Sequence, residues 1–399
     1  MTGSIQSGII VQKYGGSSVG TPEKILRVAE RVARTRATGK GVVVVVSAMG
    51  DSTDDLLALA RKVSPDPSRR ELDMLLTAGE RISMALLGMA LQRAGVEAVS
   101  FTGSQSGIIT DGVHTNARIL EVRPVRIFEE LARGKVVIVA GYQGVSREKE
   151  VTTLGRGGSD TTAVALAAAL DAEVCEICSD VDGVFTADPR VVPAARRLAE
   201  LTHGEMQELA LAGAKVLNAQ AVEFARDRGI VLHARSTFTD GPGTKVVRAG
   251  TGPRELRIAG VAQESELLVV RRAASAGPLH GLTTLLAAHG AWPRELRAGG
   301  AGTEAWVSLE NVHGPEALRA ALRGLPGVEV LEGLAFVTVV GSGLGAGPEP
   351  LQRALSALGA LGEKAAVAGV AVAPLRLSFL VPHAGGAEAV RALHAAFLE

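Results

Sequence analysis

With 399 residues, 47% of them hydrophobic and 21% charged, the chain has the length of two or three domains and the composition of an ordinary globular protein. Lys plus Arg and Asp plus Glu each number 42, and only 8 Phe, 2 Trp and 2 Tyr are present, which argues against nucleic acid or a membrane surface as a partner. With only two cysteines, a disulfide framework is not expected. The chain has no apolar run of about 18 residues, which argues against a membrane span, and its N-terminus lacks a signal-peptide pattern. We therefore expect a cytoplasmic protein.

Strand-like apolar runs alternate with helical patterns over the first 235 residues. Residues 9–14 and 42–47 are continuous apolar runs, typical of strands buried on both faces, and Thr21 followed by Pro22 begins a helix between them. The alternation continues with helices over 69–94, 124–133 and 160–170 and strands over 98–101, 135–140, 173–178 and 230–234. This order predicts an α/β fold, a three-layer α/β/α sandwich with a mostly parallel sheet.

The pattern changes after residues 236–253, which are rich in Gly, Thr and Pro and are typical of a linker. Beyond them, shorter strands and helices predict two ferredoxin-like α+β modules. The expected strands are 266–270, 305–309, 328–331, 335–340, 365–372 and 375–381, and the expected helices are 278–289, 315–323, 351–361 and 387–397. We therefore expect a first domain over 1–247, a first small module over 248–333 and a second over 334–399.

Three clusters of glycine or acidic residues follow predicted strands of the first domain. Lys13–Ser18 and Leu154–Thr162 each lead into a helix, and Ser179–Arg190 is a carboxylate-rich loop. Paired glycines let backbone N–H groups approach a phosphate beside Lys13, and Arg156 can bind a carboxylate through two hydrogen bonds. Each cluster alone is compatible with an ordinary turn. Because all three follow strands at the edge where α/β folds bind ligands, together they favour a nucleotide site.

Other familiar sites are excluded by spacing. No P-loop motif is present, and Gly341–Ala346 has the spacing of a dinucleotide fingerprint without the acidic residue that should follow. Cys175 and Cys178 are three apart on a predicted strand, so they point to opposite faces and are expected to be buried rather than to bind a metal. The eight histidines lack metal-ligand spacing, and His114, on a loop, is a minor candidate for contact with a ligand.

Taken together, the three clusters resemble the aspartate kinases of the amino-acid kinase family. The resemblance extends over residues 9–247 and includes Val43–Gly50, Leu75–Glu80, Thr102–Asp111 and Gly213–Leu217 in the family's order. It implies an amino-acid kinase domain followed by two ACT modules. It also implies transfer of phosphate from ATP to the side-chain carboxylate of L-aspartate, giving 4-phospho-L-aspartate, the entry step to lysine, threonine, methionine and isoleucine.

The resemblance also implies roles for individual residues. Lys13 would stabilise the transferring phosphoryl group, and Asp160 would orient this lysine. Arg156 would bind the α-carboxylate of L-aspartate and Glu80 its α-ammonium group. The remaining implied contacts are Ser47, Gly157, Gly158 and Ser159 for aspartate and Gly15, Gly16, Ser17, Ser179, Asp180, Asp182, Val184, Asp188, Arg190 and Lys215 for ATP, which Lys13 also contacts. Mg²⁺ would bridge the phosphate oxygens, without a dedicated protein metal site.

The chain departs from the family's pattern at two places. Cys178 stands where these kinases commonly carry Tyr, which affects a contact on the adenine side. Ser275–Pro278 replaces the Asp-x-Pro-Gly turn of the first ACT module and lacks its acidic residue. We therefore expect little inhibition by lysine and threonine, and we expect the two modules to serve mainly in holding a homo-oligomer together.

Two alternatives remain open from the sequence. One is a kinase for another acid, such as glutamate or N-acetylglutamate, and the other is a non-catalytic amino-acid-binding regulator with the same fold. Arg156 together with Glu80 favours a free α-amino acid as the substrate, and the presence of Lys13 and Asp160 favours catalysis.

Overall fold

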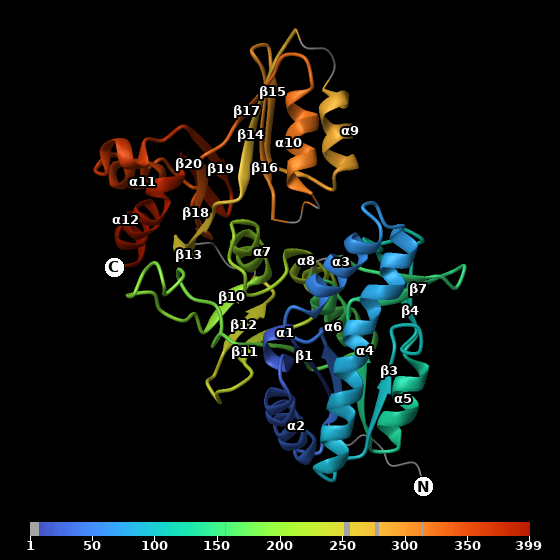
Figure 1. Cartoon of the computed structure of the whole chain (residues 1–399). Coiled ribbons are helices and arrows are strands. Elements are labelled where there is room, and N and C mark those ends of the chain that lie inside the picture. The colour runs from blue at the N-terminus through green and yellow to red at the C-terminus, as the bar shows by residue number, and fades with distance from the viewer. Residues whose placement is uncertain (1–7, 156, 251–255, 276–278, 311, 313) are drawn as a thin grey trace. The chain divides into compact units, whose positions relative to one another are not determined.

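The computed structural model describes residues 8–155, 157–250, 256–275, 279–310, 312 and 314–399. The chain forms two compact units (Figure 1). The N-terminal unit comprises Met1–Val184, Arg197–Gln207 and Val216–Gly250, and the C-terminal unit comprises Phe185–Arg196, Glu208–Lys215 and Thr251–Glu399. Each unit is therefore built from segments that are not contiguous in the sequence.

The N-terminal unit is organised around a large sheet. Its strands are β1 (Ile9–Tyr14), β2 (Gly41–Val46), β3 (Ala98–Phe101), β6 (Val136–Ala140), β9 (Val174–Ser179), β10 (Glu200–Thr202), β11 (Leu232–Ser236) and β12 (Thr244–Val247). They lie in the order β10-β12-β11-β9-β1-β2-β6-β3, and every neighbouring pair is parallel except β11 with β12. Because parallel strands need crossover connections, helices must cover both faces of this sheet.

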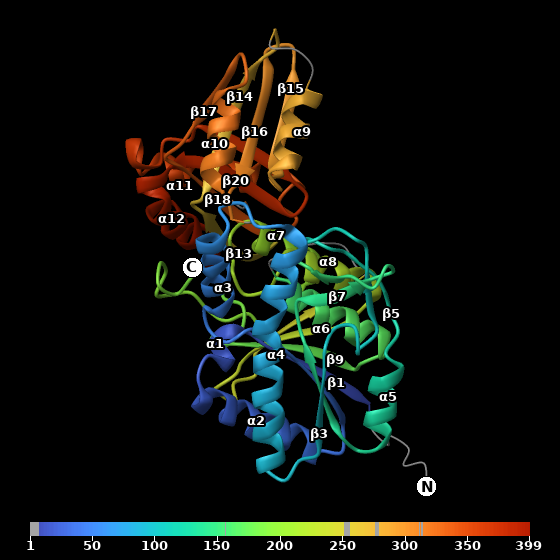
Figure 2. The same ribbon diagram turned by 45° about the vertical axis from the view of Figure 1, so that its right-hand side comes forward.

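The helices of this part of the chain are α1 (Gly16–Val19), α2 (Pro22–Ala37), α3 (Ser52–Val63), α4 (Arg69–Arg93), α5 (Val125–Ala132), α6 (Gly158–Ala169), α7 (His203–Leu211) and α8 (Ala219–Arg228). Helices cover the sheet on both sides (Figure 2), whereas α3 packs on α4 and the end of α7 belongs to the C-terminal unit. Helix α2 begins as the sequence predicts, because the Thr21 side chain accepts a hydrogen bond from the backbone of Lys24 (3.3 Å) and Pro22 follows it. The alternate residues Val42, Val44 and Val46 of β2 pack against α2 and α4.

Helix α4 is long and apolar enough to cross a membrane by length and composition, and it is the one such helix in the described part of the chain. Half of its most apolar stretch is buried inside the structure, as in the core helix of a globular unit. Its buried residues include Leu76, Leu87 and Leu91, so its apolar face is occupied by the unit's own core.

A small four-stranded sheet completes the N-terminal unit. Its strands, which the sequence analysis did not predict, are β4 (Ile108–Thr110), β5 (Ile119–Val122), β7 (Gln143–Ser146) and β8 (Val151–Thr153), in the order β5-β4-β7-β8. Strands of three or four residues give only a weak pattern in the sequence. This sheet matters for the site because β8 leads directly into the Leu154–Thr162 cluster.

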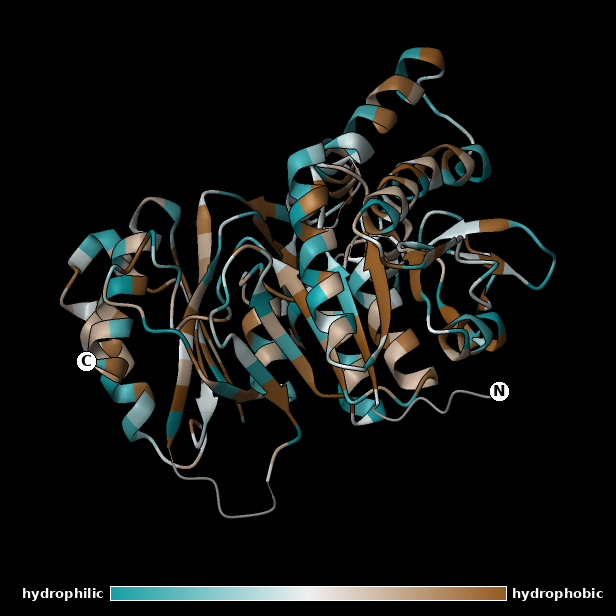
Figure 3. Ribbon diagram, turned by 90° about the horizontal axis from the view of Figure 1, so that it is seen from below, coloured by the Kyte–Doolittle hydropathy of each residue, from teal (hydrophilic) through white to brown (hydrophobic). Residues whose placement is uncertain are grey.

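The C-terminal unit contains two antiparallel four-stranded sheets. The first comprises β14 (Leu267–Ala273), β15 (Pro293–Gly299), β16 (Gly302–Ser308) and β17 (Val328–Leu331) in the order β15-β16-β14-β17, with α9 (His280–Ala288) and α10 (Pro315–Arg323) on one face. The second comprises β13 (Arg257–Glu264), β18 (Leu334–Ser342), β19 (Gly369–Ala373) and β20 (Arg376–Pro382) in the order β13-β18-β20-β19, with α11 (Glu349–Gly359) and α12 (Gly386–Leu398). Short 3₁₀ turns cover Gly362–Ala365 and His383–Gly385. Hydrophobic residues (brown) and hydrophilic residues (teal) alternate along the helices (Figure 3).

The structure differs from the expected organisation in several ways. Strand β12 lies inside the predicted linker over 236–253, where it pairs with β10 and β11. Strand β13, which was not predicted, falls within the expected bounds of the first small module but pairs with β18 of the second, so a division at residue 333 separates it from its sheet. Residues 362–365, partly predicted as strand, form a 3₁₀ turn. These pairings join segments distant in sequence, which local patterns do not reveal.

Residues 185–196 were expected in the first domain but group with the C-terminal unit. Ala187 and Val192 belong to the hydrophobic core beneath the second small sheet. The carbonyl of Thr186 accepts a hydrogen bond from the backbone N–H of Val261 (2.8 Å), and its hydroxyl lies 2.9 Å from Nε2 of His394. The segment is therefore held by both core packing and hydrogen bonds.

Candidate active site

The two predicted catalytic residues form a buried ion pair. Lys13 lies near the end of β1 and Asp160 in the first turn of α6, with 2.6 Å between Nζ and Oδ1. Their side chains are only 13% and 11% exposed. The backbone N–H of Asn218 donates to Oδ2 of Asp160 at 3.3 Å, which fixes the carboxylate from a second side. This arrangement holds an ammonium group in place at the carboxyl end of a central strand, where anionic ligands bind in such folds.

The turn after β1 depends on two glycines. A Cβ atom on Gly16 would lie 2.9 Å from the carbonyl oxygen of Gly50 and 3.0 Å from that of Ala48, so a side chain there would force the turns after β1 and β2 apart. The N–H of Gly15 donates to the carbonyl of Cys178 at 3.4 Å, which ties this turn to β9 rather than leaving that N–H for a ligand. Ser17 is exposed at the same turn.

The cluster that begins α6 is equally crowded. Gly157 has φ of 74°, and a Cβ there would lie 2.1 Å from Nδ2 of Asn218. A Cβ on Gly158 would lie 2.8 Å from Cβ of Leu154, and the Ser159 side chain is buried. Glycine is thus required at both positions for the helix to begin beside Asn218. Arg156, the predicted ligand of the aspartate carboxylate, lies outside the described residues.

Glu80 is the most unusual carboxylate near this site. It is 3% exposed on α4, its Oε1 accepts a hydrogen bond from the backbone N–H of Ala48 at 3.2 Å, and its Oε2 has no hydrogen-bond partner among the described residues. Burial raises the pKa of Glu80 from 4.5 to about 7. Ser47, beside Ala48, donates its own N–H to the carbonyl of Tyr14 at 3.0 Å. A cationic group bound at the free oxygen would restore the ionised form.

The predicted ATP residues after β9 divide into exposed and buried groups. Asp180 and Asp182 are exposed, and the hydroxyl of Ser179 accepts from the N–H of Val181 at 3.3 Å. Val184 is buried, and its N–H donates to the hydroxyl of Thr244 at 2.9 Å. Its side chain therefore packs inside the unit instead of being exposed on the loop.

Three further predicted ATP residues belong to the C-terminal unit. Arg190 and Asp188 form an exposed ion pair with 2.7 Å between Nη2 and Oδ2, and this arginine lowers the pKa of Asp188. Lys215 is exposed in the segment Glu208–Lys215. Their role in nucleotide binding remains a prediction.

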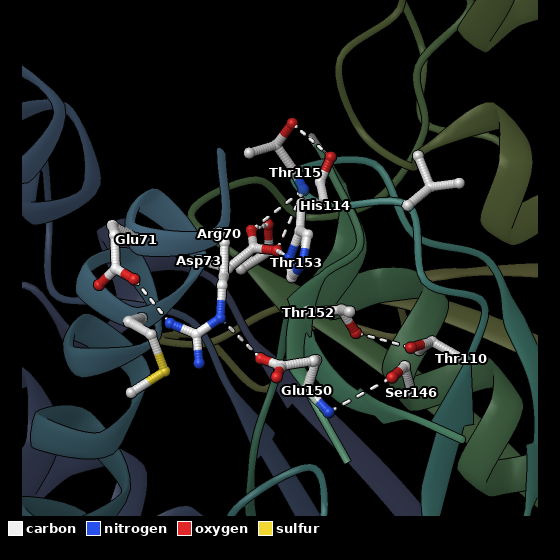
Figure 4. A network of polar contacts seen from close by, with 12 residues as sticks. Arg70, Glu71, Asp73, Thr110, His114, Thr115, Ser146, Glu150, Thr152 and Thr153 are labelled. Atoms are coloured by element: carbon white, nitrogen blue, oxygen red, sulfur yellow. Dashed lines mark hydrogen bonds and ion pairs between the residues drawn. The ribbon is translucent and has the colours of Figure 1, made fainter. Parts of the chain in front are cut away.

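A network around Asp73 was not predicted from the sequence (Figure 4). Asp73 is fully buried on α4, and it accepts hydrogen bonds from the backbone N–H of Thr115 (3.1 Å to Oδ1) and the hydroxyl of Thr153 (2.6 Å). Its Oδ2 lies 2.6 Å from Nδ1 of His114, the histidine considered as a possible ligand contact. Asp73 therefore joins the 114–115 loop and the end of β8 to α4, immediately before the Leu154–Thr162 cluster. An acidic residue on a mostly apolar helix is the one sequence signal that could have indicated it.

The cysteine prediction is confirmed, since Cys175 and Cys178 are both free and buried. Burial raises the pKa of the Cys178 thiol to about 12, so the thiol remains protonated at neutral pH. Within the described ranges, no group of three or more His, Cys, Asp or Glu residues is placed to hold a metal ion.

Comparison with known proteins identifies the family. Residues 8–236 match the model of the amino acid kinase family. An aspartokinase of Bacillus sp. (strain MGA3) is 43% identical over an alignment of 402 positions that covers 98% of this chain and 97% of the relative. The chain belongs to the aspartokinases of the amino acid kinase family. An aspartokinase of Mycolicibacterium smegmatis is 62% identical over 239 residues, an alignment that spans 60% of this chain and only 57% of that relative.

A solved aspartokinase structure has the same fold. The crystal structure of E. coli aspartokinase III in complex with aspartate and ADP superposes with a TM-score of 0.83 and 26% identity, covering 98% of this chain and all of that one. The predicted α/β/α sandwich followed by ACT-like α+β modules is thereby confirmed. The structure departs from the expected domain boundaries, for example where β13 pairs with β18, but the fold class itself is unchanged.

Proposed function

We propose that this chain phosphorylates the side-chain carboxylate of L-aspartate with ATP, giving 4-phospho-L-aspartate and ADP, as the first step of aspartate-family amino-acid biosynthesis. Its membership of the aspartokinases supports the reaction class. The buried ion pair of Lys13 and Asp160 is the observation that carries the proposal, because it provides a fixed positive charge at the end of the central strand.

The chemistry requires charge neutralisation rather than proton transfer. The aspartate side chain, with an ordinary pKa of about 3.9, is already ionised at neutral pH, so one of its oxygens attacks the γ-phosphorus while the bond to the ADP oxygen breaks. Two like charges about 4 Å apart repel by roughly 4 kcal/mol at an effective dielectric constant near 20. The ammonium group of Lys13 offsets this repulsion, and Asp160 keeps it from turning away, since the two are 2.6 Å apart.

We assign recognition of aspartate to side chains whose charges are opposite to those of its α-ammonium and α-carboxylate groups. Oε2 of Glu80, buried and without a hydrogen-bond partner among the described residues, is suited to accept the α-ammonium group of aspartate. Arg156 is proposed for the α-carboxylate, and Ser47 and Ser159 for the walls of the pocket. A substrate whose amino group is acetylated would leave the Glu80 carboxylate buried and unpaired, so N-acetylglutamate is disfavoured.

ATP is proposed to lie along the turn after β1 and the loop after β9, with Gly16, Ser17, Ser179 and Asp182 among its contacts. Mg²⁺ fits this arrangement as an ion carried by the nucleotide, because the described residues provide separate exposed carboxylates such as Asp180 but no cage. When bound, it would neutralise charge on the phosphate oxygens. Asp188, Arg190 and Lys215 are further proposed contacts of the nucleotide.

The remaining assignments concern the whole molecule. We infer a cytoplasmic homo-oligomer whose subunits associate through the ACT-like modules, with neither nucleic acid nor membrane as a partner. We divide the sequence into a kinase domain near residues 1–247 and two modules over 248–333 and 334–399. This division follows the order of the parts along the chain. In the structure, β13 pairs with β18 of the second module, and residues 185–196 group with the C-terminal unit.

The proposal is tested by measuring ADP release with L-aspartate, L-glutamate and N-acetyl-L-glutamate, with hydroxylamine present to trap the acyl phosphate. We expect turnover with L-aspartate alone. Lys13→Ala should lower this turnover at least about 100-fold, whereas Lys40→Ala is the matched control, because Lys40 forms an exposed ion pair with Glu173 in the same unit. Preference for either glutamate substrate, or the lack of hydroxamate from aspartate with wild-type protein, would contradict the proposal.

A further inference from the structure

The segment Ser236–Asp240, called here the 236–240 loop, begins at the last residue of β11 and lies in a region whose composition is typical of a linker. Its backbone is held by one buried side chain. Nη1 of Arg31, a residue of α2 that is 5% exposed, lies 2.6 Å from the carbonyl oxygen of Ser236 and 3.4 Å from those of Thr237 and Thr239. Burial of a guanidinium group is unfavourable unless hydrogen bonds compensate for lost water, so these carbonyls fix the loop to the helix.

Two more arginines of α2 contact the same loop. Arg27, Arg31 and Arg34 are spaced by four and three residues, which places them on one face of the helix. Arg27 donates to the carbonyl of Phe238 at 3.1 Å, and its guanidinium lies 4.6 Å from the centre of the Phe238 ring. Arg34 approaches Asp240 at 3.6 Å on the surface. The loop is thus ordered along its whole length by one helix face.

The side chains on the other side of the loop contact the proposed ATP site. The hydroxyl of Thr237 lies 2.7 Å from that of Ser18, directly after the turn that carries Gly16 and Ser17, and its N–H donates to the carbonyl of Ser179 at 2.7 Å. The hydroxyl of Thr239 donates to Oδ1 of Asp182 at 2.5 Å. Two threonines therefore connect the turn after β1 with the loop after β9.

We propose that the 236–240 loop positions the ATP site, with Thr237 and Thr239 as positioning residues and Arg31 as the residue that orders the loop behind them. The inference rests on the proposed function, in which ATP lies against these two segments. Asp182 is exposed, so without the Thr239 hydrogen bond its carboxylate would adopt many orientations. Fixing it before the nucleotide arrives reduces the entropy lost on binding.

The test uses Thr237→Val and Thr239→Val, which remove a hydroxyl with little change of shape. We measure steady-state KM values for ATP and aspartate, kcat, and the Kd of ADP by calorimetry. We expect the KM for ATP and the Kd of ADP to rise about tenfold in Thr239→Val, with kcat and the KM for aspartate within about twofold of wild type. Thr239→Ser, which keeps the donor, should restore the wild-type values.

Thr38→Val is the matched control, because its hydroxyl bonds a backbone carbonyl at the other end of α2 (2.7 Å). An unchanged Kd for ADP in both threonine variants, or an equal rise in KM for both substrates, would overturn the inference. A lower melting temperature without a change in nucleotide affinity would also overturn it, since the loop would then be only structural. If wild-type protein binds ADP but phosphorylates another acid, the proposed function fails while the ADP measurements still decide this inference. If wild-type protein does not bind ADP, both fail.

Discussion

Replacement of Glu80 by glutamine should weaken aspartate binding and also stabilise the free protein. The carboxylate is 3% exposed, accepts one hydrogen bond from Ala48, and has an oxygen without a partner among the described residues. Burial raises its pKa from 4.5 to about 7, so the ionised form is disfavoured in the folded protein. Glutamine keeps the shape and the acceptor oxygen but removes the charge that the substrate ammonium group would pair with.

The size of both effects follows from the shift in pKa. A rise from 4.5 to about 7, at 1.36 kcal/mol per unit, corresponds to roughly 3 kcal/mol against the buried carboxylate. Because the folded protein binds more protons than the unfolded chain between these values, stability falls as the pH rises from 4.5 to about 7 and stays lower above it. Glu80→Gln should therefore raise the free energy of unfolding at pH ~8 by up to about 3 kcal/mol. If the ion pair between Glu80 and the ammonium group of aspartate contributes a similar free energy, its loss should raise the KM for aspartate on the order of 100-fold.

Thermal unfolding and steady-state ADP release test this prediction together. The melting temperature should rise at pH ~8 and change little at pH ~4.5, and the KM for ATP should remain near wild type. In wild-type protein the KM for aspartate should fall about tenfold between pH ~6 and ~8, as Glu80 ionises. Glu30→Gln, at an exposed site on α2, is the control. An unchanged KM for aspartate, or a lower melting temperature at pH ~8, would refute the reasoning.

Three further predictions follow from the site. Lys13→Ala should lower kcat at least about 100-fold while calorimetry still detects ADP binding, because the transferring phosphoryl group loses its neutralising charge; near-wild-type turnover would exclude this role. Arg156→Lys should raise the KM for aspartate far more than that for ATP, because an ammonium group cannot form the paired hydrogen bonds of a guanidinium; equal changes would assign Arg156 to the nucleotide. Millimolar lysine plus threonine should inhibit little, since Ser275–Pro278 carries no acidic residue for a ligand's ammonium group. Strong concerted inhibition of ADP release would contradict this.

The central strands and their ligand edge could be predicted because they obey local rules. Residues 9–14 and 98–101 form β1 and β3 with the expected bounds, since strands buried on both faces are continuous apolar runs. The gathering of the three clusters could be anticipated because they follow strand ends that converge at one edge of the sheet, whereas the pairing of Lys13 with Asp160 was implied by the resemblance to aspartate kinases. The described part of the site thus depends on topology that the sequence pattern already implies.

The rest depends on partners distant in the sequence. The 236–240 loop has the composition of a linker, and its hydrogen bonds to Arg31, Ser179 and Asp182 distinguish it from one. The same holds for β13, whose pairing with β18 spans the whole first module, and for Val184, which is held by Thr244. Gly, Thr and Pro favour turns both in flexible linkers and in ordered loops, so composition alone cannot distinguish a linker from a loop that borders a binding site.

Helix α4 carries two buried carboxylates that the fold treats differently. Asp73 and Glu80 lie seven residues, or about two turns, apart and therefore on the same face. Asp73 is fully buried and surrounded by hydrogen-bonding groups of Thr115, Thr153 and His114, so it joins separate segments of the unit. Glu80 is nearly as buried but has one donor and one free oxygen. The free oxygen of Glu80 therefore supports its proposed pairing with the α-ammonium group of aspartate, because such a pairing would offset the cost of burying the carboxylate.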